Sequence, residues 1–227
     1  MLLSIQRRPV KGMTIAANYT LSRCIGDLNV GYTTINTGTG YTNPADRKYD
    51  RGNCTGDRRH LFNLTSVAQT PTFSNTTLKA IASDWRLSGI LRKSSGAYFT
   101  VTSGQDQAKN GVGSQRPNLT GDPYSSDKSY KAYLNPASFS QPTLGTFGNS
   151  QRNSLLGPGS WGLDLALARV FQVRENQRLE FRAEGFNVSN STRFKAPASN
   201  FNSLNTFGLI TSSEDARVMQ FAVKYVF

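Results

Sequence analysis

Residues 178–184 read "RLEFRAE", and this short stretch decides between the fold classes open to the chain. Successive side chains of an extended strand point to opposite faces, so Leu179, Phe181 and Ala183 would share one face. The opposite face then carries four charged side chains of alternating sign: Arg178, Glu180, Arg182 and Glu184. Each charge would cost a few kcal/mol at the middle of a bilayer, so this face must contact water or polar protein. It is either the solvated face of an ordinary antiparallel sheet or the inner face of a membrane wall, and the features described next favour the wall.

The same period of two recurs along the chain, whereas helical periodicity is nearly absent. The stretch "WGLDLALARVFQV" (161–173) alternates apolar with small or polar residues, and Arg169 is the one charged residue on its apolar side. The chain ends on "ARVMQFAVKYVF" (216–227), which places an apolar set on one face: Phe221, Val223, Tyr225 and Phe227. The alternating runs predict strands at about 2–8, 13–22, 58–69, 84–94, 160–173, 177–188 and 216–227.

The composition excludes a helical membrane protein but allows a membrane wall built of strands. Of the 227 residues 37% are hydrophobic, and the mean hydropathy of -0.44 is polar for a chain of this length. No stretch approaches the ~18 consecutive apolar residues of a spanning helix. Barrel strands need only ~10 residues each, and their alternation hides them from averaged hydropathy.

The connections between the predicted strands have two lengths, which predicts an object with two different rims. Short connections lie at "PVKG" (9–12) and "RENQ" (174–177), and the joint at 70–83 is intermediate. Long connections cover about 23–57, 104–159 and 189–214. Outer-membrane barrels have short periplasmic turns and long extracellular loops, so the first and last strands would both run toward the periplasm. Seven strands is an odd number, and the one candidate for an eighth is "YFTVT", Tyr98–Thr102.

Large aromatic residues gather at the ends of the predicted strands. Rings in this position are typical of the aromatic girdles at the two interfaces of a membrane barrel. The candidate girdle residues are Trp85, Trp161, Phe171, Tyr225 and Phe227. The opposite face would line a wet lumen and contact a plug or a solute through Arg178, Glu180, Arg182, Glu184, Gln220 and Lys224. We expect cross-strand ion pairs among these luminal residues.

Several motifs together resemble the C-terminal barrel of TonB-dependent outer-membrane receptors, most closely the large receptors with a carboxypeptidase-regulatory-like domain ahead of the plug. These motifs are "IQRRPVKGMTIAANYTLS", "GDRRHLFNL", "DWRLSGILRKSSGAYFTVTSGQD", "GVGSQRPNL", "FRAEGFNVSN" and "MQFAVKYVF". The resemblance implies an all-β fold, an antiparallel transmembrane β-barrel segment forming the C-terminal third of a 22-stranded barrel. Residues 1–227 would then be part of one barrel domain.

The resemblance also implies a function and a set of partners. Such receptors import a nutrient, an iron chelate, a glycan or a peptide, across the outer membrane of Gram-negative cells. Extracellular loops and the plug bind the ligand, and TonB pulls the plug to release it inward. Outer-membrane lipid and lipopolysaccharide would surround the wall. The terminal Phe221, Val223, Tyr225 and Phe227 resemble the signal read by the β-barrel assembly machinery.

The sequence does not contain several features of this family. It has no plug domain, no energy-coupling box and no signal peptide, because "MLLSIQRRPVKG" has a strand pattern, with Arg7, Arg8 and Pro9 where an apolar segment should be. We therefore expect a fragment of a longer protein whose location is the outer membrane.

The charge and the cysteines are compatible with a location in the cell envelope. The net charge of +12 would suit nucleic acid, but the basic residues are dispersed, so no nucleic-acid partner is expected. Cys24 and Cys54 both fall in the first long connection, where an oxidising envelope would let them pair. Free thiols are the alternative, and a metal site lacks further ligands nearby.

No catalytic residue, metal site or cofactor is expected, and the chain is not expected to be an enzyme. His60 is the single histidine, and its place at a strand start favours a hydrogen-bonding role at the rim. The stretch "GPGSWG" (157–162) matches a dinucleotide-binding spacing but leads into a strand instead of a helix.

Two other hypotheses about the fold and the function remain open at this point. A self-contained eight-stranded barrel, acting as an adhesin or a small pore, requires Tyr98–Thr102 in the wall and the first strand paired with the last. A soluble carbohydrate-binding β-sandwich would instead bury Trp161, Phe181 and Tyr225 in one dry core.

Overall fold

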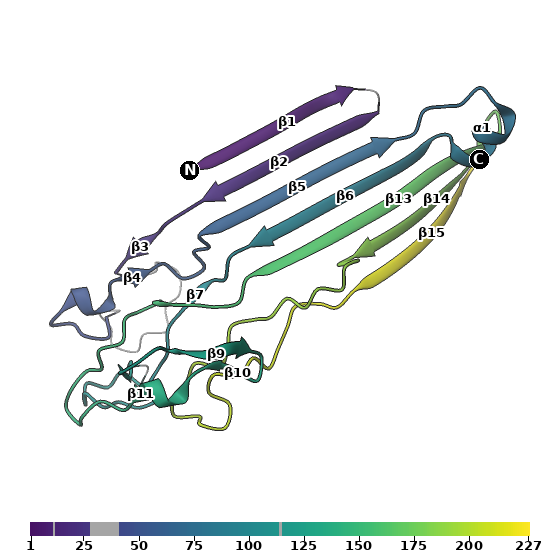
Figure 1. Cartoon of the computed structure of the whole chain (residues 1–227). Helices are drawn as coiled ribbons and strands as arrows, with labels where there is room; N and C mark the ends of the chain where they lie inside the picture. Colours follow the sequence, from purple (N-terminus) through teal and green to yellow (C-terminus); the bar gives the residue numbers. More distant parts are fainter. Residues whose placement is uncertain (11, 28–40, 114) are drawn as a thin grey trace.

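The main element of the computed structural model is one seven-stranded antiparallel sheet, called the wall below (Figure 1). The structure describes residues 1–10, 12–27, 41–113 and 115–227. Neighbours in the wall follow the order of the chain: β1 (Leu2–Val10), β2 (Met13–Leu21), β5 (His60–Gln69), β6 (Trp85–Ser94), β13 (Ser160–Arg174), β14 (Gln177–Phe186) and β15 (Val218–Val226). Each of the seven predicted ranges overlaps one of these strands. The all-β, antiparallel prediction is confirmed.

The two ends of the wall differ, as the connection lengths predict. The end of β1, the start of β2, the β13–β14 turn and the C-terminus lie at one end, together with helix α1 (Thr76–Ala82) of the β5–β6 connection (Figure 1). We call this end the short-turn rim. The three long connections meet at the other end, the loop rim (Figure 1).

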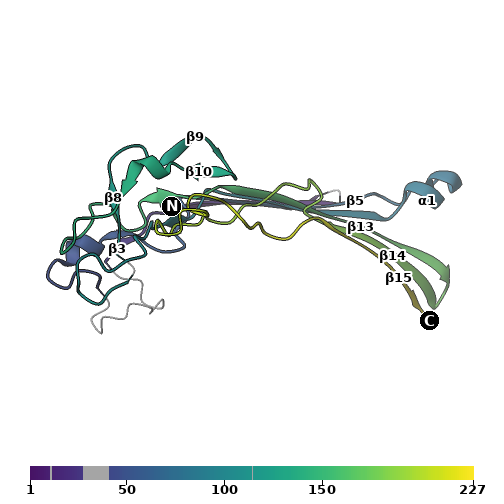
Figure 2. The same ribbon diagram turned by 90° about the horizontal axis from the view of Figure 1, so that it is seen from below.

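Strand pairing gives the wall one apolar and one polar face. On the apolar face, Leu167 pairs with Leu87, and Phe181 with Val223. Seen edge-on, the wall is a single layer of strands, and β13, β14 and β15 curve at the short-turn rim (Figure 2). Within the described residues, no helix is both long enough and apolar enough to cross a bilayer.

The buried core of the molecule lies in the long connections and not against the wall. Short elements organise these connections: β3 (Ile25–Gly26) with β4 (Gly52–Asn53), β7 (Tyr98–Phe99) with β12 (Leu155–Leu156), β8 (Asn118–Leu119) with β11 (Phe139–Ser140), β9 (Tyr124–Ser129) with β10 (Ala132–Leu134), and the 3-10 helices η1 (Arg47–Asp50) and η2 (Pro136–Ser138). Their hydrophobic cluster contains Val101, Tyr133, Leu134, Phe139, Leu155, Phe207 and Ile210. We call this unit the loop assembly.

Tyr133 shows how closed the loop assembly is. Its hydroxyl donates a hydrogen bond to the Leu156 carbonyl oxygen at 3.0 Å. Burial raises the pKa of Tyr133 to about 12, with a smaller contribution from Tyr124. The phenol therefore stays neutral at any physiological pH, as a hydroxyl buried in a packed core should.

The structure places the candidate eighth strand outside the wall. Tyr98–Phe99 pairs with Leu155–Leu156 within the loop assembly. Within the described residues, β1 and β15 each have one neighbour in the wall and do not pair with each other. The wall is therefore an open sheet, and the arrangement that the eight-stranded alternative requires is absent from it.

Replacing Leu134 by alanine should loosen the loop assembly. Leu134 is 1% exposed, so the substitution leaves a cavity, with an expected cost of about 2–5 kcal/mol. Protease cleavage and amide hydrogen exchange in residues 95–159 should both accelerate. Leu144→Ala is the matched control, because Leu144 is 65% exposed and should cost little. Equal effects of the two substitutions would show that the cluster does not hold the connections together.

Candidate functional site

The apolar face carries aromatic rings at both rims. Strand order puts the predicted girdle residues Trp85, Phe171, Tyr225 and Phe227 at the short-turn rim and Trp161 at the loop rim. Trp161 and Phe171 share the same face of β13 near its two ends. At ~3.3 Å per residue and a strand tilt of ~40°, these two rings would be ~25 Å apart across a membrane, which is the height of the apolar band of a barrel.

Two further rings strengthen the aromatic set at the loop rim. Tyr19 lies near the end of β2 and Phe62 near the start of β5, and the two residues pair in register on the apolar face. The Tyr19 hydroxyl lies 2.7 Å from Nδ1 of His60, which gives the single histidine a hydrogen bond at the rim. The sequence pattern alone does not identify Tyr19 as a girdle residue, because its position relative to Phe62 and Trp161 depends on strand register.

The six predicted luminal residues lie on the polar face of β14 and β15. Arg178, Glu180, Arg182 and Glu184 pair in register with Val226, Lys224, Ala222 and Gln220 respectively. Nη2 of Arg182 is 2.7 Å from the Glu180 carboxylate, and Nη1 is 3.7 Å from that of Glu184.

The expectation of cross-strand ion pairs is wrong for β14 and β15. In the described part of the chain, Lys224 lies opposite Glu180 without an ion pair, and Arg182 pairs along its own strand instead. Residues two apart on a strand share a face at a spacing of roughly 7 Å, which a long arginine side chain can span.

A cross-strand ion pair does occur farther toward the loop rim. Nη1 of Arg92 on β6 lies 2.9 Å from the Asp164 carboxylate on β13, and the same carboxylate accepts the Asn187 backbone N–H at 2.8 Å. The pair borders a hollow of about 320 Å³, also lined by Arg58 and Arg193. The alternation alone could place Asp164 on the polar face, but identifying Arg92 as its partner requires the register of β6 against β13.

The predicted assembly signal lies on an unpaired edge of the wall. Phe221, Val223 and Tyr225 project from the apolar face of β15, and all are at least half exposed. Phe227 follows the strand at the short-turn rim and is 91% exposed. In the described residues nothing covers this row, so it is accessible to lipid or to another protein.

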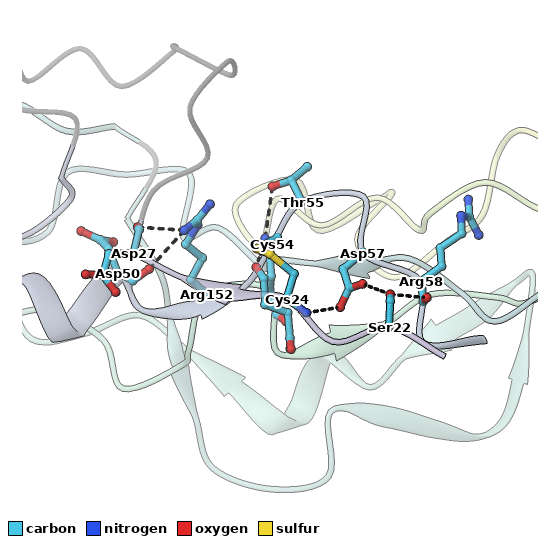
Figure 3. The surroundings of a disulfide bond; sticks show 11 residues. Ser22, Cys24, Asp27, Asp50, Cys54, Thr55, Asp57, Arg58 and Arg152 are labelled. Atoms are coloured by element: carbon cyan, nitrogen blue, oxygen red, sulfur yellow. Dashed lines mark hydrogen bonds between the residues drawn. A yellow bond between two sulfur atoms is a disulfide. The ribbon is translucent and has the colours of Figure 1, made fainter. Parts of the chain in front are cut away.

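A disulfide between Cys24 and Cys54 closes the base of the first long connection (Figure 3). Their Cα atoms are 5.3 Å apart, and the Cys54 N–H donates to the Cys24 carbonyl at 3.1 Å. Beside them, Asp57 accepts hydrogen bonds from the Ser22 hydroxyl and the Cys24 N–H (Figure 3). Closing a loop with a sequence separation of 30 contributes ~3–4 kcal/mol in the chain-entropy account.

A buried ion pair joins the first long connection to the second. Nη1 of Arg116 lies 2.9 Å from Oδ1 of Asp50, and both side chains are almost fully buried. Arg116 also donates to the carbonyl oxygens of Ser150 and Tyr49, and its guanidinium lies 3.8 Å from the centre of the Tyr49 ring. The other carboxylate oxygen of Asp50 accepts the Thr42 N–H at 2.6 Å. The guanidinium and the carboxylate of this pair therefore each have further hydrogen-bond partners, as a buried pair requires.

An open, basic hollow lies beside this network. Its volume is about 740 Å³, and its lining includes Tyr49, Phe147 and one carboxylate, that of Asp46, against four cationic side chains, those of Arg23, Lys48, Arg51 and Arg152. Arg152 is already committed to the Asp27 and Asp50 carbonyl oxygens (Figure 3). The hollow therefore offers an aromatic and positively charged surface at the loop rim, which favours anionic groups.

Comparison with known proteins gives one match. The family described as "Outer membrane beta barrel domain" matches the chain over residues 1–220. Neither the curated proteins nor the solved structures gave a match.

Removing the arginine of the buried pair should open the loop assembly. Arg116→Met leaves the Asp50 carboxylate buried without its counter-charge, which costs about 3–5 kcal/mol. Hydrogen exchange at the Thr42 and Asn43 amides, both bonded to Asp50, should accelerate in parallel with protease cleavage. Arg51→Met is the matched control. Arg51 pairs with Asp27 at the surface, so its loss should cost under about 1 kcal/mol. Similar effects of both substitutions would contradict the role given to the buried pair.

Proposed function

The chain belongs to the outer membrane β-barrel domain family, and we propose that it forms wall and extracellular loops of a TonB-dependent receptor that imports a nutrient. The observation that carries this proposal is the division of one open sheet into an apolar face with rings at both rims and a charged face. Lipid would cover the first face, and water, plug or solute would contact the second. The proposed role is transport without catalysis.

The loop assembly supports a receptor role beyond that of a plain pore. A folded core, a disulfide and a buried ion pair hold the long connections in one arrangement. Such order is what a binding surface needs, because a preorganised site loses little entropy when the ligand binds. We propose that the basic hollow at Arg23, Lys48 and Arg51 contacts an iron chelate, a glycan or a peptide before it enters the lumen.

The directions of the two edge strands support a larger barrel. Seven antiparallel neighbours leave β1 and β15 running the same way, toward the short-turn rim. Pairing β15 with β1 would therefore be parallel, both within one chain and between two copies inserted in the same orientation. An antiparallel wall needs an odd number of further strands between these edges. A 22-stranded barrel with a plug, coupled to TonB, meets that requirement.

The exposed row on β15 supports a role in assembly. Phe221, Val223, Tyr225 and Phe227 are presented together on an unpaired edge, where a strand can be added. We propose that the β-barrel assembly machinery reads this row.

The two alternative hypotheses, an eight-stranded barrel and a soluble sandwich, fit the structure less well. An adhesin or pore of eight strands would need Tyr98–Phe99 in the wall, and these residues pair in the loop assembly. A carbohydrate-binding sandwich would bury Trp161 and Tyr225, which are 46% and 50% exposed.

Thiol labelling of intact cells tests the orientation of the wall. Leu204 is exposed in the β14–β15 connection at the loop rim, and Asn176 is exposed in the β13–β14 turn at the short-turn rim. A membrane-impermeant maleimide should label Leu204→Cys on intact cells, and Asn176→Cys only after the outer membrane is permeabilised. The reverse labelling pattern would show that the wall has the opposite orientation in the membrane. Equal labelling of both positions on intact cells would show that the wall does not lie in the membrane.

Uptake measurements test the receptor role. Loss of the protein and loss of TonB should abolish uptake of the same nutrient, because the proposed step needs energy from the inner membrane. Labelled iron chelates, glycans and peptides are the compounds to screen, with a proton uncoupler as an independent means of stopping uptake. Uptake that continues without TonB would indicate a passive pore. A loss of attachment with unchanged uptake of every compound would indicate an adhesin.

A further inference from the structure

Helix α1 (Thr76–Ala82) exposes apolar side chains at the short-turn rim. Leu78 is 49% exposed and Ile81 is 66% exposed. They are three residues apart, so they project from the same side of the helix. Within the described residues nothing packs over this side.

The connection holds α1 in a defined position. The Asn75 side chain caps the helix by accepting the backbone N–H groups of Thr77 and Leu78. Fully buried Ser83 accepts the Phe73 N–H at 2.8 Å, and Thr72 donates to Asp84 at 2.8 Å. The exposure of Leu78 and Ile81 is therefore a feature of a fixed helix.

Arg169 fastens α1 over the apolar face of the wall. This arginine is the one charged residue on the apolar side of β13, and it is 7% exposed. Its Nη1 and Nη2 donate to the carbonyl oxygens of Ile81 and Lys79 at 2.9 and 3.0 Å. A cation at the C-terminal carbonyls of a helix also complements the helix dipole.

Aromatic rings complete the attachment. The Arg169 guanidinium lies 4.4 Å from the centre of the Phe171 ring and 5.3 Å from that of Trp85. The Trp85 indole N–H donates to the Ile81 carbonyl at 2.7 Å, and the ring packs edge-on against Phe181. These rings belong to the apolar face, so α1 lies on the lipid side of the wall.

We propose that α1 is an interfacial helix that inserts Leu78 and Ile81 into the periplasmic leaflet of the outer membrane. This inference rests on the proposed membrane location of the wall. Lipid is the occupant because the exposed side of α1 continues the apolar face that the membrane covers, at the level of the aromatic rings. Lys79, exposed on the same helix, can extend its ammonium group to the lipid phosphates.

In this arrangement the role of Arg169 is to hold α1 on the apolar face of the wall. A free arginine on the lipid face would be unfavourable, whereas here backbone carbonyls of the helix accept hydrogen bonds from both terminal nitrogens of Arg169. The wall thereby gains an anchor at one rim that fixes its depth in the inner half of the bilayer.

Site-specific fluorescence in vesicles tests the proposal. The two cysteines of the chain are joined to each other, so Ile81→Cys adds a unique thiol for an environment-sensitive fluorophore. Thr76→Cys, on the opposite side of α1, is the matched control. The protein is reconstituted in vesicles of phosphatidylethanolamine and phosphatidylglycerol, and quenching by iodide in water is compared with quenching by a shallow doxyl-labelled phospholipid.

We expect iodide to quench the probe at residue 81 several-fold less than the probe at residue 76, and the doxyl lipid to quench it several-fold more. Equal iodide quenching at both positions would place α1 in water. Protection of residue 81 from both quenchers would mean that protein covers the helix. Either result overturns the inference.

A third position separates failure of this inference from failure of the proposed function. Leu87 is exposed on the apolar face of β6. If doxyl lipid quenches a probe at Leu87→Cys but not one at residue 81, α1 alone is misassigned. If it quenches neither, the wall itself is not in the bilayer.

Discussion

The structure depends on one constraint: a strand in hydrocarbon must have its backbone N–H and C=O groups bonded to neighbouring strands, because no water is available there. Continuous antiparallel pairing from β1 to β15 meets this need for all the inner strands of the wall. Pairing in turn fixes the register, and register fixes which side chains share a face. A shift by one residue would place Glu180 and Arg182 among the lipid tails and Phe181 in the lumen.

The same constraint separates two kinds of stability in the molecule. In the described residues the wall has no dry core of its own, so most of its apolar face would be covered by lipid. The loop assembly lies outside the bilayer and must bury its own apolar groups, which it does around Leu134 and Phe207. Its polar groups follow the rule for water-soluble domains, in which the buried charge of Asp50 is matched by Arg116.

The sequence was sufficient for the wall and insufficient for the loop assembly, and the reason is the range of the interactions. A wall strand is recognisable by itself, because its period of two is local, and all seven predicted ranges overlap strands. The cluster around Leu134 combines residues from 99 to 210, and most of its strands have only two or three residues, too few to show a periodicity. Helix α1 was missed for the same reason, since it has only seven residues. The partners of Arg182 and Arg92 depend on register and rotamer, which alternation does not specify.

Arg169 shows how a local sequence pattern and the tertiary structure are related. In the sequence Arg169 interrupts an apolar face, and the pattern alone predicts that such a charge is unfavourable in a membrane strand. In the structure a helix from another connection covers it, and the carbonyls of Lys79 and Ile81 that accept its hydrogen bonds are groups that every helix end leaves unsatisfied. Two unfavourable features, a cation on the apolar face and a short helix at its rim, thus satisfy each other. An apparent violation of a local pattern can therefore mark the place where a second element docks, and here that element carries apolar side chains to the membrane surface.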